Sequence, residues 1–245
     1  SSQSRGLGDV YKRQVLYELI RISVIGIQKG VFYKPNGKKL ASYLESLGPI
    51  FTKFGQLLST RTDILDLATA KELESLTDSC KPFDVSTFKK IVESELGDSI
   101  TNIFETFDES PMAAASLAQV HSATLKNGNE VVIKVLRPNI EKRVKRNLRL
   151  LKSAAKIFTY IYKDSYRLKP NEVVRDYEST ILKELDLKLE ASNTNLTRKN
   201  FLGSKELYIP EVYWDLTTSK VMVLEKIDGT VSYTHLRAHE TETNL

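Results

Sequence analysis

The sequence predicts an α+β protein in which helices occupy about the first hundred residues and a small antiparallel sheet follows. Two observations support this prediction. Apolar residues first recur with the 3.6-residue period of an amphipathic helix, and from about residue 101 they occur in short, strand-like runs. Turn-forming pairs such as Asn127-Gly128 separate those runs. Segregated helices and strands are typical of an α+β fold rather than of βαβ repeats.

The helical part covers residues 15–97. Its period is interrupted at Gly48-Pro49, two residues that disfavour continuation of a helix. We expect a further helix to begin after Asp84, whose carboxylate can cap free N–H groups, and to end at Gly97.

Five strands, an alanine-rich loop and two long helices are expected in the second part. The strands cover residues 102–107, 117–125, 130–136, 208–214 and 220–224. Asn127-Gly128 joins the second strand to the third, and Thr217-Thr218-Ser219 joins the last two. The helices, residues 140–163 and 171–200, lie between the third and fourth strands. The loop contains Ala113, Ala114, Ala115 and Ser116 and precedes the second strand.

Composition and charge exclude several classes of protein. The chain has 245 residues, of which 41% are hydrophobic and 27% charged, as in ordinary globular proteins. A single cysteine excludes an internal disulfide framework. The most apolar stretch, residues 15–31, is interrupted by four polar residues, so a packed helix is favoured there over a surface-lying amphipathic one. The net charge of +5 is mild, and the basic stretch 141–152 is typical of a solvated surface rather than of a nucleic-acid partner.

Both ends lack either period. Residues 1–14 and 230–245 resemble translated sequencing adapters, and we exclude them from the fold prediction. On this interpretation His235 and His239 are not metal ligands, and Gly6-Leu7-Gly8 is not a phosphate loop. The remaining chain is divided into a helical extension, residues 15–100, and a sheet domain, residues 101–229.

Lys134 lies within the branched apolar run of residues 131–136. Side chains alternate along a strand, so Val132, Lys134 and Leu136 share one face. A lysine inside such a strand is costly unless its charge is needed. The pattern V-x-I-K occurs in the strand whose lysine holds ATP phosphates in kinases. A lysine that blunts an edge strand against aggregation is the alternative that these four residues leave open.

Several motifs occur together with this lysine. They are residues 53–61 (KFGQLLSTR), 113–121 (AAASLAQVH), 132–138 (VIKVLRP), 184–193 (ELDLKLEASN) and 208–213 (YIPEVY). Together they resemble the UbiB/ABC1/ADCK family of atypical protein-kinase-like proteins, most closely its bacterial ubiquinone-biosynthesis branch, from about residue 47 to residue 229. The resemblance implies a kinase-like N-lobe preceded by a family-specific helical extension.

The resemblance also implies the nucleotide site. Lys134 is expected to pair with Glu190, with Glu184 as the alternative, and breaking such a buried pair typically costs about 3–5 kcal/mol. Alanines replace the glycine-rich loop of kinases, and alanine largely forbids positive φ, so this loop is more restricted in shape. The residues implied in cofactor binding are Lys134, Glu190, Ala113, Ala114, Ala115, Ser116, Glu225 and Ile227, the last two through their backbone at the adenine hinge.

The K-x-G-Q motif places Lys53 and Gln56 on one face of a helix, because they are three residues apart. Gly55 between them costs about 1 kcal/mol relative to alanine, which suggests that another backbone approaches there. The resemblance implies that this helix covers the cleft and that Lys53 reaches the E-x-D residues Glu184 and Asp186. Glu184 and Glu190, six apart on one expected helix, point in different directions.

The resemblance implies an intact parent that is an ATP- and Mg²⁺-dependent kinase or ATPase. Its expected role is ubiquinone biosynthesis on the cytoplasmic side of the bacterial inner membrane, held peripherally or through its C-terminus. The expected partners are nucleotide, isoprenoid quinone precursors or membrane lipid, and other ubiquinone-biosynthesis proteins. A covered cleft favours ATP hydrolysis or small-molecule phosphorylation over a protein substrate.

No H-x-D or D-F-G motif follows Gly229, and these motifs supply the catalytic and metal-binding residues of a kinase. We therefore expect an N-terminal fragment without catalytic or metal-binding residues of its own, unable to complete phosphoryl transfer. The alternative function is a non-catalytic lipid-binding or scaffolding protein that uses nucleotide as a switch.

Overall fold

The computed structural model describes residues 16–31, 36–161, 168–204 and 207–227. The chain divides into two compact units. The first comprises residues 1–78 and 139–182, and the second comprises residues 79–138 and 183–245. The predicted α+β class is confirmed, because the first unit is helical and the second contains an antiparallel sheet with helices.

Three short helices of the first unit pack against one another. They are α2 (Gly37–Leu47), α3 (Pro49–Ser59) and α4 (Leu67–Glu74). The predicted interruption at residues 48–49 is confirmed: Gly48 has φ 106°, in the region that favours glycine, and Pro49 begins α3.

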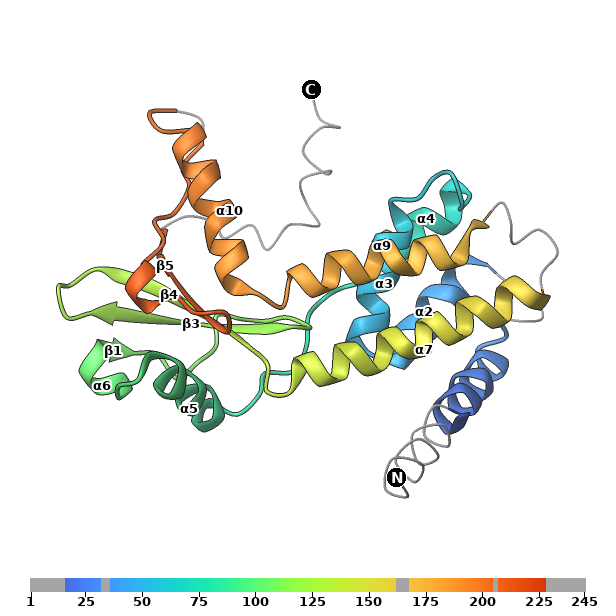
Figure 1. Cartoon of the computed structure of the whole chain (residues 1–245), viewed down its shortest axis with the longest axis horizontal. Helices are drawn as coiled ribbons and strands as arrows, with labels where there is room; N and C mark the ends of the chain where they lie inside the picture. Colours follow the sequence, from blue (N-terminus) through green and yellow to red (C-terminus); the bar gives the residue numbers. More distant parts are fainter. Residues whose placement is uncertain (1–15, 32–35, 162–167, 205–206, 228–245) are drawn as a thin grey trace, which may run out of the picture. The chain divides into compact units, whose positions relative to one another are not determined.

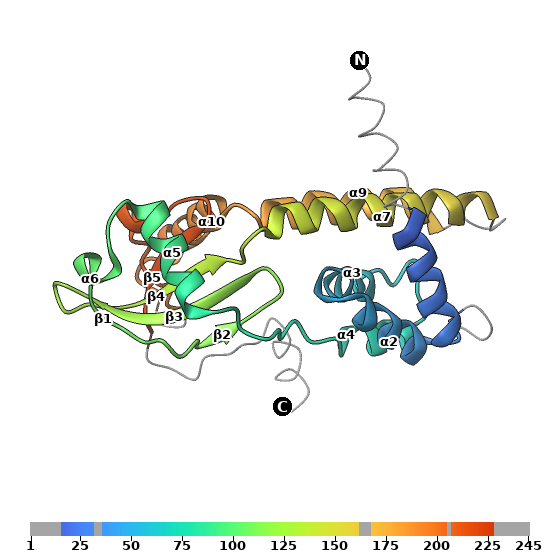
Figure 2. The same ribbon diagram turned by 90° about the horizontal axis from the view of Figure 1, so that it is seen from below.

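Two longer helices of this unit, α7 (Ile140–Ile161) and α9 (Pro170–Lys183), lie side by side (Figures 1 and 2). Lys152 Nζ and Glu178 Oε1 join them at 2.7 Å. The buried Tyr177 hydroxyl donates to the Ile50 carbonyl at 2.5 Å, and this contact joins α9 to α3.

The first helix of the unit, residues 16–28, is packed on one face only. Ile22 is buried there, and its carbonyl accepts a hydrogen bond from the Tyr43 hydroxyl. Five large apolar side chains elsewhere on the helix are 45–67% exposed: Leu16, Tyr17, Ile20, Val24 and Ile27. The prediction of a packed helix therefore holds for one face only. No helix within the described residues is long and apolar enough to cross a bilayer.

The sheet of the second unit has the order β1–β3–β4–β5, with β2 paired to β3, and every pairing is antiparallel. The strands are β1 (Phe104–Phe107), β2 (Ala113–Ala114), β3 (Ala118–Leu125), β4 (Glu130–Leu136) and β5 (Val221–Glu225). Three predicted strands, residues 117–125, 130–136 and 220–224, correspond closely to β3, β4 and β5. The predicted strand 102–107 begins later, because α6 (Ile100–Ile103) occupies its start.

Two predictions about the sheet were wrong. Residues 208–214 do not form a regular strand: Val212 makes an isolated bridge to Leu224, and Trp214–Leu216 form a 3-10 turn, η1. The alanine run, predicted as a loop, includes β2, in which Ala113 and Ala114 pair with Val120 and Gln119 of β3. The five-strand count therefore holds with a different membership.

One face of the sheet is covered by α5 (Val85–Leu96), whose ends are as predicted. The Asp84 carboxylate accepts from Thr87 N, and Gly97 at the other end has φ 77°. Phe88 and Val92 of this helix are fully buried against the side chains of Val131, Ile133 and Val135. Figures 1 and 2 show α10 (Leu187–Asn200) on the opposite side of the sheet from α5.

The single helix predicted over residues 171–200 is in fact two helices, α9 and α10. The interruption is at Asp186, which adopts an extended backbone (φ −123°, ψ 97°) while its carboxylate accepts from Lys188 N at 3.0 Å. An aspartate in this conformation is a good N-cap, so a new helix begins there. The grouping into units also differs from the predicted division at residue 100, since α5 belongs with the sheet and α7 and α9 with the first unit.

Candidate functional site

Lys134 lies on β4, between β3 and β5. Its neighbours across the sheet are Val120 on one side and Met222 on the other, so it is not on an edge strand. The alternative of an anti-aggregation edge lysine is therefore excluded. Its amine lies 2.6 Å from Glu190 Oε1 of α10, which is the pairing that was predicted.

The Lys134–Glu190 pair is more open than the sequence suggested. The two side chains are 29% and 38% exposed. The alternation of β4 explains this, because residues 131, 133 and 135 take the covered face and Lys134 takes the other. For a pair so accessible to water, the contribution to stability is expected to be about 0–1 kcal/mol rather than 3–5 kcal/mol.

Helix α10 holds Glu190 by its first turn. Leu187 and Ala191 on the same helix are fully buried. The Leu187 N–H, which has no partner within the helix, donates to the Ser219 carbonyl at 2.9 Å. Glu190 therefore extends from a helix whose start is fixed at both the Asp186 cap and the Ser219 carbonyl.

The E-x-D residues lie at the break between helices. Asp186 caps α10, while Glu184 precedes it outside either helix. The prediction that Glu184 and Glu190 share one helix is wrong, and the angular argument based on it does not apply. The approach of Lys53 to these carboxylates would join the two units, and it stays a prediction.

The alanine segment is held in place by hydrogen bonds. Cys80 N donates to the Ala114 carbonyl at 2.9 Å, and Ala115 N donates to the Ala118 carbonyl at 2.9 Å. Arg137 Nε donates to the Ala115 carbonyl at 2.7 Å. Much of its backbone is therefore engaged, unlike a glycine-rich loop that presents several free N–H groups to phosphates.

Ser116 is the exception within this segment. Its residue is 2% exposed, and its hydroxyl has no hydrogen-bond partner among the described residues. A buried hydroxyl without a partner costs about 1–3 kcal/mol. An ammonium such as that of Lys134 is suited to a phosphate oxygen, whereas the covered Ser116 hydroxyl reaches a ligand only if the alanine segment moves. Of these residues, Lys134 fits a nucleotide phosphate.

The predicted hinge follows β5 directly. Glu225 N donates to the Glu211 carbonyl, and Lys226 N donates to the Glu130 carbonyl. The Glu225 carboxylate is also engaged: it accepts from the Tyr208 hydroxyl at 2.7 Å and from Glu211 N at 3.1 Å. The hydrogen bond from the Tyr208 hydroxyl to the Glu225 carboxylate raises the pKa of Tyr208.

Ile227 ends this described segment and is 42% exposed. Asp228 and Gly229, which the resemblance included, lie outside the described residues. So do His235, His239 and Gly6-Leu7-Gly8.

The K-x-G-Q residues lie on α3 in the first unit. Gln56 Nε2 donates to the Leu76 carbonyl at 2.8 Å, and Lys53 Nζ lies 3.8 Å from Asp78 Oδ2. A Cβ at Gly55 would lie 2.5 Å from Leu76 Cδ1 and 2.8 Å from Leu44 Cδ1. Leucine side chains therefore lie close to this glycine, whereas a neighbouring backbone was expected, and a larger residue would displace their ends.

Sequence reasoning missed the polar network behind the alanine segment. His121 is fully buried; its Nδ1 lies 2.8 Å from the Asp108 carbonyl and its Nε2 lies 2.8 Å from Gln119 Nε2. Gln119 Oε1 also accepts from Phe83 N. With the Gln119 amide donating, the imidazole is neutral and Nδ1 carries its proton. The alternating burial of β3 puts His121 on the covered face, but its partners are distant in sequence and give no local signal.

No group of three or more His, Cys, Asp or Glu side chains in the described part of the chain is arranged to hold a metal ion.

Residues 75–245 match the ABC1 atypical kinase-like domain. A protein named "Probable protein kinase UbiB" from Shewanella baltica (strain OS185) is 43% identical over 228 residues, which cover 91% of this chain and 42% of that protein. One of the same name from Cellvibrio japonicus (strain Ueda107) is 49% identical over 193 residues, or 79% of this chain and 35% of that protein. The chain thus spans about two fifths of the length of these relatives.

A solved structure has a similar fold. It is the complex of Rv3197 with erythromycin from Mycobacterium tuberculosis, with a TM-score of 0.51 and 23% sequence identity. The match covers 89% of this chain and 52% of that chain.

Proposed function

Because the chain belongs to the ABC1 atypical kinase-like family, as a UbiB-like member, we propose that its second unit binds the phosphates of ATP at Lys134. The observation that carries this proposal is the 2.6 Å pair between Lys134 and Glu190. The pair lies on the face of the sheet opposite α5, where both side chains are part-exposed, and this face is called the open face. In a kinase-like site the carboxylate orients the amine, and the amine holds the phosphates.

The alanine segment supports the same site. The hydrogen bonds of Ala114 and Ala115 hold that segment in one conformation beside β3. A preorganised segment binds an anion at a smaller entropic cost than a mobile loop. The ordered alanine segment thus replaces the flexibility of a glycine-rich loop with a fixed shape.

The proposed site also includes the hinge, which contacts the adenine base, and Mg²⁺ as a second cofactor. The adenine base is proposed to lie against the backbone at Glu225 and Ile227, after β5. Mg²⁺ supplies charge neutralisation between phosphates when it is bound with ATP. In the first unit, Lys53 and Gln56 are proposed to act on this site through Glu184 and Asp186.

For the whole protein we propose an atypical kinase or ATPase that supports ubiquinone biosynthesis in bacteria, at the cytoplasmic side of the inner membrane. Its partners are isoprenoid quinone precursors or membrane lipid and other proteins of that pathway. That this chain alone completes no phosphoryl transfer stays a prediction. The second candidate, a lipid-binding scaffold switched by nucleotide, is favoured by the exposed apolar side chains of residues 16–28.

Calorimetric titration of ATP into the chain, with and without Mg²⁺, tests the nucleotide site. Lys134→Ala removes a charge-assisted contact worth about 1.5–3 kcal/mol, so binding should weaken by roughly ten- to a hundredfold. Lys126→Ala is the matched control, because Lys126 belongs to an exposed ion pair of the same sheet with Glu105. Equal affinity of Lys134→Ala and the unchanged chain would refute the site. ATP turnover measured alongside binding distinguishes the enzyme from the scaffold.

A further inference from the structure

Glu95 lies on α5, on the opposite side of the sheet from α10. Its carboxylate contacts the turn of residues 217–220, and that turn contacts the elements that carry Lys134 and Glu190. The Glu95 side chain is 19% exposed. One carboxylate oxygen, Oε1, lies 2.7 Å from Lys220 Nζ, and the other, Oε2, accepts from the Thr218 hydroxyl at 2.9 Å. Glu95 is thus separated by more than 120 residues from the turn that it binds.

The turn of residues 217–220 is closed by Thr218. Its hydroxyl oxygen accepts from Lys220 N and from Val221 N, both at 3.1 Å, while its proton goes to Glu95. Thr218 N donates to the Val221 carbonyl at 2.7 Å. The carboxylate therefore sets the direction of the hydroxyl around which this turn is folded.

Two parts of the site depend on the same turn. The Ser219 carbonyl accepts from Leu187 N, the first residue of α10, and Glu190 lies one turn further along that helix. The Lys220 carbonyl accepts from Leu136 N at 3.0 Å, two residues after Lys134 on β4. The turn thus contacts both the helix that carries the carboxylate and the strand that carries the amine.

We propose that Glu95 is a positioning residue for the Lys134–Glu190 pair, acting through the 217–220 turn and the first turn of α10. Loss of its contacts leaves the Ser219 carbonyl less firmly placed, and α10 then shifts or fluctuates relative to β4. Through this path of contacts, a molecule that binds α5 would change the nucleotide site from the opposite side of the sheet. The inference rests on the proposed function for its meaning, but its test needs no nucleotide.

The test is the reactivity of the Lys134 amine in the intact chain toward a small amine-reactive ester, followed by peptide mass spectrometry. In Glu95→Ala the rate of Lys134 labelling should rise about fivefold, the change expected when a contact worth one hydrogen bond no longer biases the helix. Thr218→Val removes this link together with the two hydrogen bonds that the hydroxyl accepts from Lys220 N and Val221 N, so its increase should be at least as large. The double variant should label no faster than Thr218→Val alone, because both substitutions act through the same turn. Glu95→Gln retains an acceptor for Thr218 and should restore most of the protection.

Two internal controls separate positioning from loss of structure. Glu105→Ala breaks the exposed pair with Lys126 in the same unit and should leave Lys134 labelling unchanged. Labelling of Lys142, exposed on α7, should be the same in every variant. Unchanged Lys134 reactivity in Glu95→Ala, or an increase shared by Lys142, overturns the proposal. Failure of ATP to bind the unchanged chain would instead count against the proposed function and would leave this labelling result intact.

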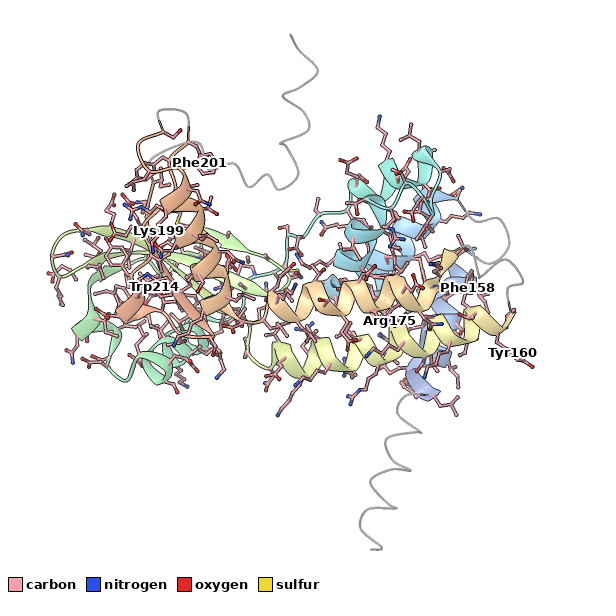
Figure 3. All side chains as sticks on the ribbon, turned by 45° about the horizontal axis from the view of Figure 1, so that its top comes forward. Phe158, Tyr160, Arg175, Lys199, Phe201 and Trp214 are labelled. Carbon is pink, nitrogen blue, oxygen red and sulfur yellow. The ribbon has the colours of Figure 1, made fainter. Side chains whose placement is uncertain are left out.

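Turn 217–220 directly follows η1, which carries Trp214, labelled in Figure 3. The residue is 44% exposed. The fluorescence of the Trp214 indole therefore provides a second readout of the turn, because its emission depends on the surroundings of η1. Glu95→Ala should alter the Trp214 emission in the folded chain, while Glu105→Ala should not. The same emission from both variants would contradict a displacement of this turn.

Discussion

The two faces of the sheet in the second unit differ in packing although they share the same strands. On one face, Val131, Ile133 and Val135 of β4 are fully buried beneath α5. On the other face, Lys134 is 29% exposed and contacts the part-exposed Glu190 of α10. The alternation of a strand thus separates residues that stabilise the fold from residues that can bind a ligand. Substitutions on the two faces should therefore have separable effects.

The largest expected effect is on the covered face. Ile133→Ala removes a fully buried side chain and should lower the free energy of unfolding by about 2–5 kcal/mol. Urea denaturation followed by circular dichroism measures this change. A loss below that of Lys134→Ala would contradict the division of the sheet into a stabilising and a binding face.

His121 provides the next test, on the same covered face. Burial lowers its pKa, so the unfolded chain binds a proton more readily than the folded one. Stability from this residue is complete above the unfolded pKa of about 6.5 and is lost as the pH falls below it toward the lower folded pKa. The free energy of unfolding should therefore decrease between pH 7 and pH 5.

The variant His121→Leu separates this residue from the other titrating groups. It leaves the Asp108 carbonyl without its partner and removes one of the two acceptors of Gln119 Nε2, which should cost about 1–3 kcal/mol at pH 7. Its unfolding free energy should also depend less on pH between 5 and 7. An unchanged pH dependence would show that His121 does not titrate with unfolding.

On the open face, Lys134→Ala should change stability by no more than about 1 kcal/mol, because the ion pair is accessible to water. The same variant should lose most of its affinity for ATP. Thermal unfolding with and without ATP measures both effects in one experiment. A large loss of stability without ligand would mean that the pair is mainly structural.

The smallest effect is expected at the exposed pair of Lys126 and Glu105, whose side chains are 50% and 63% exposed. Glu105→Ala should alter the free energy of unfolding by less than about 1 kcal/mol and leave ATP affinity unchanged. Denaturation and calorimetry of this variant set the baseline for the others. A larger effect on either quantity would show that exposed charges of this unit influence its stability or its ATP affinity.

Local sequence patterns predicted β4, the alternation of its side chains and the capped ends of α5. They also supported the resemblance from which the Lys134–Glu190 pair was inferred, and that contact is present. These features depend on neighbouring residues or on a specific motif, so they can be predicted from the local sequence. The break at Asp186 could have been read as well, because aspartate before an apolar run is an N-cap signal.

Other features depend on contacts between distant residues. Residues 208–214 have the composition of a strand, yet hydrogen bonds of Glu225 with Tyr208 and Glu211 hold them in an irregular path. The orphan hydroxyl of Ser116 and the link from Glu95 to Thr218 have no local pattern at all. Side-chain packing at Gly55 likewise involves Leu44 and Leu76, which the helical period alone does not bring to that position.

The most direct measurement is covalent labelling by an acyl-phosphate derivative of ATP, which acylates an amine that contacts its phosphates. Mass spectrometry of the labelled chain should identify Lys134 as the main site, and excess ATP should suppress that label. Acylation spread over exposed lysines such as Lys126 and Lys142, with no protection by ATP, would contradict the central claim that the open face of this sheet holds a nucleotide.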